Sequence, residues 1–153
     1  MRRRRGGFTF VEILMSMTII AILAGIVIPK AGSFVKRAKA ASVIGDVSVI
    51  RNALAEYNAD SLSYPASAAT GLIPAGLGPY LGPNFSFVKT DYSLGYSNWT
   101  IYQTINGHPS TTTIIGITVQ TDDATLGEYV MAQLSTFPKF QWANNYTFIV
   151  DGL

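Results

Sequence analysis

The chain has 153 residues, the length of one domain, and 48% of these are hydrophobic whereas only 13% are charged. It contains no cysteine, which excludes disulfides and thiolate metal sites. Its formal net charge of +2 depends on four arginines at residues 2–5, and residues 52–153 carry −5, so general nucleic-acid binding is not expected.

An apolar segment follows the arginines. Residues 13–29 carry no charge, and residues 8–29 carry only that of Glu12. At about 1.5 Å per helical residue this run can cross a bilayer core of about 30 Å, and the basic flank places the N-terminus in the cytoplasm. A secretory signal peptide is one alternative, but the run exceeds its usual length of about 7–15 residues and lacks an Ala-x-Ala cleavage site. A plain membrane anchor is the other.

Glu12 is the residue that a plain anchor does not need. An acidic side chain near the centre of a membrane helix costs about 2.5–3.5 kcal/mol, less near its end, and is expected to have a cationic partner. The alternatives are a carboxylate that extends toward the lipid headgroups or one that is protonated.

A short motif surrounds this glutamate and reads Gly6-Gly7-Phe8-Thr9-Phe10-Val11-Glu12. It resembles the cleavage motif of type IV prepilins and type II secretion pseudopilins. The resemblance implies that prepilin peptidase removes residues 1–7 as a leader peptide by cutting between Gly7 and Phe8, and that Phe8 is then N-methylated. It also implies that Glu12 meets the N-terminal amine of a neighbouring subunit during filament assembly.

The physics of charge burial agrees with that role for Glu12. A buried carboxylate and a buried ammonium are each costly alone and much less so when paired. Both charges would therefore be satisfied only when neighbouring subunits are in the correct register. The partners that the resemblance implies are other subunits in a helical homo- or hetero-polymer, prepilin peptidase, an inner-membrane assembly platform and membrane lipid.

The helical pattern continues beyond the membrane segment. An apolar stripe with spacings of three and four residues predicts helix as far as about Asn58; it consists of Val43, Val47, Ile50, Leu54 and Tyr57. We divide this helix into a transmembrane and assembly half, residues 8–29, and an amphipathic half, residues 30–60.

A kink or locally melted stretch is predicted at Gly25 and Pro29, because proline removes the hydrogen bond to the Gly25 carbonyl. Many type IV pilins have proline at the corresponding position, and the resemblance implies that the adjacent segment can unwind in a filament. A static kink is the alternative.

Four basic residues lie just beyond the membrane segment: Lys30, Lys36, Arg37 and Lys39. One interpretation pairs them with the acidic surface of a neighbouring subunit. The other is a solvated or lipid-facing basic collar.

Residues 61–153 are expected to form a globular body. Alternating patterns predict strands at residues 85–88, 99–105, 115–119 and 146–150, and Asn106-Gly107 indicates a tight turn, although residues 109–112 suggest a longer loop. Acidic residues at 122 and 123 precede a helical pattern at 124–134. The fold class is α+β: a long N-terminal helix packed on a small antiparallel sheet, pilin-like, with a short helix in the C-terminal half. Aromatic residues in the strands are assigned to the core rather than to a ligand platform.

No catalytic or cofactor-binding constellation is expected, because the one histidine, His108, lies in a predicted turn. Asp122 and Asp123 could help to bind calcium, as residues near the C-terminus of major pseudopilins do. One adjacent pair does not supply the six to eight oxygen ligands that calcium takes, so helix capping is favoured and no metal site is expected.

The chain is thus predicted to be a non-enzymatic structural subunit of a type IV pilus-like filament. It would be inserted once in the inner membrane and then enter an extracellular pilus or a periplasmic pseudopilus. A type II secretion pseudopilin is the first alternative, and a membrane-anchored binding module that does not polymerise is the second.

Overall fold

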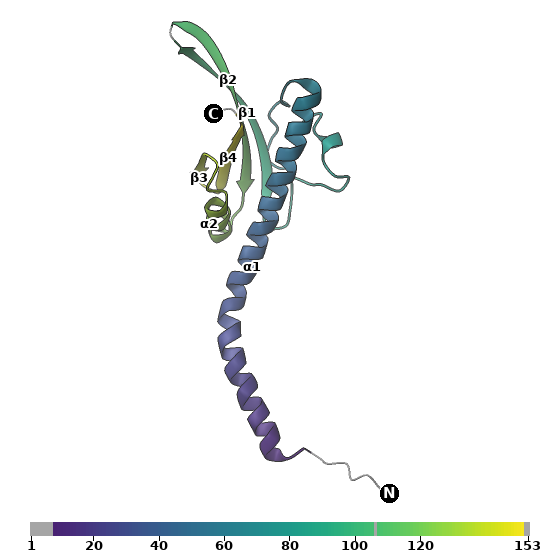
Figure 1. Ribbon diagram of the computed structural model, residues 1–153, viewed down its shortest axis with the longest axis vertical. Coiled ribbons are helices and arrows are strands. Elements are labelled where there is room, and N and C mark those ends of the chain that lie inside the picture. Colours follow the sequence, from purple (N-terminus) through teal and green to yellow (C-terminus); the bar gives the residue numbers. More distant parts are fainter. Residues whose placement is uncertain (1–7, 106, 152–153) are drawn as a thin grey trace. The chain divides into compact units, whose positions relative to one another are not determined.

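A computed structural model of the chain describes residues 8–105 and 107–151, with the backbone alone at residues 29–31 and 105. The chain separates into two compact units, divided between Val35 and Lys36. The helix α1 (Phe10–Ser61) has 52 residues and contributes to both units (Figure 1).

The first unit is the N-terminal part of α1. Among the described residues, one helical span is long and apolar enough to cross a membrane, Phe10–Ile28, with a mean hydropathy of 2.5 and none of it buried. The backbone is helical through Gly25 and Pro29. A methyl group added at Gly25 would meet nothing within 4 Å, so packing does not require this glycine here. Local melting therefore stays a prediction for the assembled state.

The second unit is built on a four-stranded antiparallel sheet. Its strands are β1 (Ser93–Ile105), β2 (His108–Gln120), β3 (Lys139–Trp142) and β4 (Asn145–Asp151), in the order β1-β2-β4-β3 (Figure 1). A 3-10 turn, η1 (Gly78–Tyr80), lies in the Pro- and Gly-rich connection before the sheet. The expected α+β class is confirmed.

Residues 85–88 do not form the strand that their alternation predicted. Among the described residues they form one isolated bridge, between Val88 and Ser93, and the Phe87 carbonyl accepts from the Leu94 N–H at 2.7 Å. Phe87 is instead 1% exposed in the core, where its ring meets that of Phe85 edge to face. Phe85 and Phe87 thus pack in or against the core although their segment is not a strand of the sheet.

The core lies between the sheet and the C-terminal half of α1. Four of the five stripe residues of the helix are buried: Val43, Val47, Ile50 and Leu54. They pack in one cluster with inward-facing residues of three strands, Leu94, Tyr96, Ile115, Ile117, Val119, Tyr146 and Phe148. Full burial of such a side chain stabilises the fold by about 1.5–3 kcal/mol, so this half of the helix is held by its own body.

The β1–β2 hairpin turns tightly. Ile105 pairs with His108, which leaves a two-residue connection of Asn106, outside the described residues, and Gly107 at φ +81°. Residues 109–112 belong to β2 rather than to a longer loop. Because β4 pairs with β2 only from Ile115 onward, the distal part of the hairpin is a two-stranded ribbon that extends beyond the sheet (Figure 1).

The residue that follows α1, Leu62, has a backbone conformation in the left-handed region. Leu62 has φ +53°, its N–H donates to the Asn58 carbonyl at 2.9 Å, and its side chain is 90% exposed. That backbone costs a non-glycine residue about 1–2 kcal/mol, whereas glycine adds about 0.5–1 kcal/mol of unfolded-state entropy. We therefore expect Leu62→Gly to raise the free energy of unfolding by up to about 1 kcal/mol, measured by denaturant unfolding of the full chain in detergent. Leu62→Val should lower it, and a Gly variant less stable than the parent would contradict the account.

Two tyrosines, Tyr92 which is buried and Tyr64 which is half-buried, connect loops to other elements. The Tyr92 hydroxyl donates to Asp46 of α1 at 2.6 Å, and burial together with this hydrogen bond raises the pKa of Tyr92 to about 12. Tyr64 donates to Asp151, and burial with that contact raises the pKa of Tyr64 to about 12. A pKa raised above the ordinary value of 10 means that this stabilisation is complete below pH 10 and is lost as the pH rises toward 12.

We accordingly expect the free energy of unfolding to fall between about pH 10 and pH 12 through these tyrosines. Denaturant titrations at stepped pH measure the slope. The double variant Tyr64→Phe/Tyr92→Phe should be less stable at neutral pH but show a shallower alkaline decline. An unchanged slope in this variant would rule out the tyrosines as its cause.

Candidate processing and assembly site

The predicted cleavage point lies at the edge of the described chain. Gly7 is outside the described residues, whereas Phe8 is 84% exposed immediately before α1. Cleavage after Gly7 and methylation of Phe8 stay predictions.

Glu12 lies in a reciprocal capping box with Thr9. The Thr9 hydroxyl oxygen accepts a hydrogen bond from the Glu12 N–H at 3.3 Å. In return, Glu12 Oε2 accepts from the N–H and from the hydroxyl of Thr9, each at 3.3 Å. This arrangement satisfies backbone donors that the first helical turn would otherwise leave open. The role of Thr9 was not predicted from the sequence, although the Thr-x-x-Glu spacing before an apolar run indicates such a box.

The capping box gives Glu12 a role within its own chain. A carboxylate is stabilised at a helix N-terminus by the helix dipole as well as by these hydrogen bonds. The contacts are long and exposed, and all use one oxygen, although a carboxylate offers about four acceptor positions. Glu12 can therefore accept a further donor, such as an ammonium group, while Thr9 still holds it.

The hydroxyls near Glu12 are satisfied within the helix. Ser16 donates to the Glu12 carbonyl and Thr18 to the Leu14 carbonyl, both at 2.8 Å. Side chains of the same helical face border a shallow apolar hollow of about 330 Å³; they are Val11, Leu14, Met15, Thr18 and Ile19. Glu12 is the one charged residue of the exposed apolar span Phe10–Ile28, whose side chains require cover by lipid or protein.

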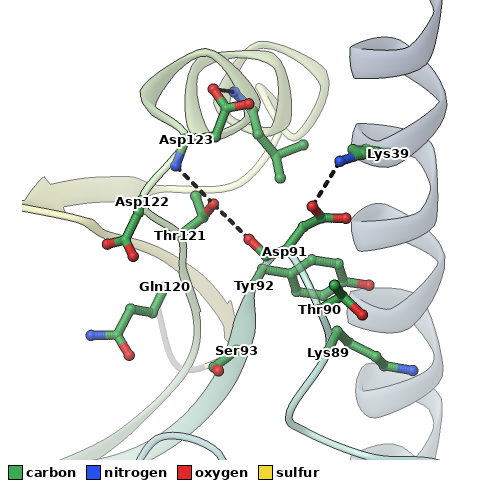
Figure 2. A pocket seen from close by; sticks show the side chains of 11 residues that line it. Lys39, Lys89, Thr90, Asp91, Tyr92, Ser93, Gln120, Thr121, Asp122 and Asp123 are labelled. Carbon is green, nitrogen blue, oxygen red and sulfur yellow. Dashed lines mark hydrogen bonds and ion pairs between the residues drawn. The ribbon is translucent and has the colours of Figure 1, made fainter.

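A second hollow, of about 540 Å³, lies in the body beside α2 (Ala124–Gln133) (Figure 2). Asp123 is the N-cap of α2: its Oδ1 accepts from the N–H groups of Thr125 at 3.0 Å and Leu126 at 3.3 Å. These backbone hydrogen bonds, that of Leu126 foremost, lower the pKa of Asp123. The predicted capping role is confirmed.

The other carboxylates of this hollow are also engaged. Asp122 accepts from the Asn144 amide at 2.9 Å, and Asp91 accepts from Lys39 Nζ at 2.7 Å. Figure 2 shows the carboxylates of Asp122 and Asp123 pointing apart. Among the described residues no group of three or more His, Cys, Asp or Glu side chains could hold a metal ion.

Lys36 and Lys39, two of the four basic residues beyond the membrane segment, form ion pairs within their own unit. Lys36 lies 3.6 Å from Asp123, and Lys39 lies 2.7 Å from Asp91. The side chains of both pairs are about 40% exposed, so solvent screens them and each contributes little to stability. Neither interpretation from the sequence anticipated these contacts.

His108, which the sequence placed in a turn, is the exposed first residue of β2.

Comparison with known proteins agrees with the N-terminal features. The family described as "Prokaryotic N-terminal methylation motif" matches residues 2–28. The chain is 38% identical to type II secretion system core protein G of Pseudomonas aeruginosa over 66 residues, which are 43% of this chain and 46% of that protein. The protein of the same name from Escherichia coli K12 is 29% identical over 85 residues, 54% of this chain and 59% of that protein.

The match to Aeromonas hydrophila core protein G is 32% identical over 66 residues, 43% of this chain and 46% of that protein. The chain spans about half the length of the curated relatives it matches. No significant match exists among solved structures.

The chain has a prepilin-type N-terminal methylation motif, an exposed apolar helix and a helix-on-sheet body, and in these features it is similar to the type IV pilin and pseudopilin class. Within that class the chain is distantly homologous to type II secretion core protein G. The expected resemblance is confirmed, as is assignment to structural proteins rather than enzymes. The relatives favour the pseudopilin alternative over the surface pilus that the sequence analysis placed first.

Proposed function

We propose that the chain is a pseudopilin, a structural subunit of the periplasmic filament of a type II secretion system. The observation that carries this proposal is the 38% identity with a type II secretion core protein G, in a chain that also has the methylation motif. In this account residues 1–7 are the leader, residues 8–29 anchor and assemble, residues 30–60 form the amphipathic half of the helix and residues 61–153 form the body.

Processing would create the group that Glu12 needs. Cleavage between Gly7 and Phe8 by prepilin peptidase leaves a new amine at Phe8, which carries positive charge even when methylated. Glu12 keeps an open carboxylate oxygen beside the exposed apolar face of the helix. When a neighbouring subunit covers this face, a carboxylate and an ammonium buried together satisfy each other, whereas a misplaced subunit leaves both unpaired.

Before assembly, the subunit would reside in the inner membrane. The apolar run Phe10–Ile28 has the length for one crossing, and the preceding arginines favour a cytoplasmic N-terminus. An assembly platform in that membrane would then exchange lipid contacts for contacts with other subunits. The apolar area that is covered is similar in both states, so polar pairing rather than burial would decide between them.

Deletion of the gene in the native host distinguishes this role from its alternatives. We expect secreted proteins to disappear from the culture medium and accumulate in the periplasm, while sheared surface filaments stay at the parental level. Loss of surface filaments with intact secretion would instead identify a pilus subunit. A binding module that does not polymerise would leave both unchanged and would tolerate Glu12→Ala.

A further inference from the structure

The sheet face that points away from α1 carries exposed aromatic side chains. Trp99 on β1 is 38% exposed, and Phe140 on β3 is 48% exposed. Cross-strand partners and alternate residues share a face, so the pairs Trp99–Ile114 and Phe140–Thr147 both lie on this side. The opposite face holds the buried residues that pack with α1.

The two rings meet across intervening strands. β2 and β4 lie between β1 and β3, yet the ring centroids of Trp99 and Phe140 are 6.4 Å apart at an angle of 50°. Gly116 makes this possible, because a Cβ there would lie 2.5 Å from Trp99 Cζ3 and 3.3 Å from Thr147 Cγ2. The indole therefore reaches over β2 toward β3. We call Trp99 and Phe140 the aromatic strip.

The surroundings of the aromatic strip are uncharged. The outward positions within residues 97–101, 112–118, 140–142 and 145–149 include no Asp, Glu, Lys, Arg or His. They do include the partly exposed hydroxyl residues Ser97, Thr112 and Thr118, the last of which is hydrogen-bonded to the buried Thr147 with their oxygens 2.8 Å apart. Hydroxyls both donate and accept hydrogen bonds, and the faces of aromatic rings attract C–H groups through their partial negative charge.

We propose that the aromatic strip binds a neutral polysaccharide, a role beyond that of a filament subunit. Sugar rings present C–H faces bordered by hydroxyls and carry no charge, which matches both the rings and the hydroxyls of this face. A second protein copy fits less well. The three exposed aromatic side chains of this face, Trp99, Phe140 and Trp142, bury about 450–750 Å² together, whereas a stable interface takes about 800 Å² from each partner.

Affinity electrophoresis of the full chain in mild detergent tests this site. Native gels containing dextran, xylan or a soluble β-glucan should retard the parent chain relative to a gel without polysaccharide. Trp99→Ala and Phe140→Ala should each weaken the apparent binding at least about tenfold. Tyr102→Ala is the matched control, because Tyr102 is 82% exposed on β1 but lies on the opposite face, and its retardation should be unchanged.

Gly116→Ala provides a variant that keeps both rings. The added methyl group displaces the Trp99 indole from its place over β2, so we expect weaker retardation without loss of an aromatic residue. Circular dichroism melts confirm folding of each variant. Because the test uses solubilised chains, its outcome does not depend on whether the protein polymerises or serves secretion.

Several results would overturn the proposal. They are no retardation by any of the three glycans, retardation by an anionic polysaccharide such as polygalacturonate only, equal loss in Tyr102→Ala, and a Trp99-dependent dimer in gel filtration without glycan binding. The last would assign the face to a second copy of the chain.

Discussion

Substitution of Glu12 by alanine is expected to abolish filament assembly while leaving the precursor inserted and processed. Removal of one partner from a buried ion pair leaves the other charge uncompensated and costs about 3–5 kcal/mol, which corresponds to a subunit contact weaker by a factor of roughly 10² to 4 × 10³. The apolar surface of the helix is unchanged, so membrane insertion is retained or improved. Immunoblots of cross-linked periplasmic filaments and of membrane fractions measure both effects.

Two variants separate pairing from capping. Ser16→Ala removes a hydroxyl one turn away that is satisfied by the Glu12 carbonyl, and assembly should stay at the parental level. Thr9→Val removes the hydroxyl of the capping box but keeps Glu12, so a partial defect is expected because the carboxylate is held less firmly. Normal filaments formed by Glu12→Ala would exclude charge pairing as the condition of assembly.

Substitution of Gly127 by alanine is expected to destabilise the body by about 3 kcal/mol. A Cβ at this position in α2 would lie 2.0 Å from Tyr146 Cζ and 2.3 Å from Cε2. The Tyr146 side chain is 2% exposed and packed in the core, so neither the ring nor α2 can move without loss of contacts. The better helix propensity of alanine, about 1 kcal/mol, does not offset this overlap. Denaturant unfolding of the full chain in detergent gives the difference.

Gly45→Ala is the matched control for this prediction. Gly45 also lies within a helix of the body, but an added Cβ would meet nothing within 4 Å, so stability should rise by up to about 1 kcal/mol. Tyr146→Leu should reduce the cost of Gly127→Ala in a double-mutant cycle, because the ring is the atom group in conflict. Equal stability of Gly127→Ala and the parent would contradict the described packing of α2 on β4.

Local signals in the sequence predicted most of the fold. The stripe from Val43 to Leu54 identified the buried side of α1, and the acidic residues before residue 124 identified the start of α2. Both depend on interactions within a few turns of chain. β3 was missed because Lys139–Trp142 is only four residues long and forms through pairing with β4, a contact that sequence periodicity does not reveal.

The same limit applies to the aromatic residues. Assignment to the core is correct for Tyr96, Tyr146 and Phe148, but Trp99 and Tyr102 are exposed. A period of two shows that alternate residues share a face of a strand, without showing which face another element covers. The reach of Trp99 over Gly116 depends on strand order and could not be derived from either residue alone.

At the N-terminus, the sequence identified Glu12 because one charge within an apolar run is conspicuous on composition alone. It did not reveal how the carboxylate is held. Thr9 contributes because the backbone N–H groups of the first helical turn lack partners within the helix and are satisfied by the capping box. The spacing of Thr9 and Glu12 indicates this box, whereas the charge of Glu12 alone does not.

Mass spectrometry of the mature N-terminus, in membranes and in any filament that contains the protein, tests the central claim most directly. The pairing of Glu12 with a neighbour's amine requires that amine to exist next to the apolar helix. We predict a chain that starts at Phe8 and carries a methyl group on its terminal nitrogen. A native protein that starts at Met1 with its four arginines attached could not form the pair, and the assembly account would be wrong.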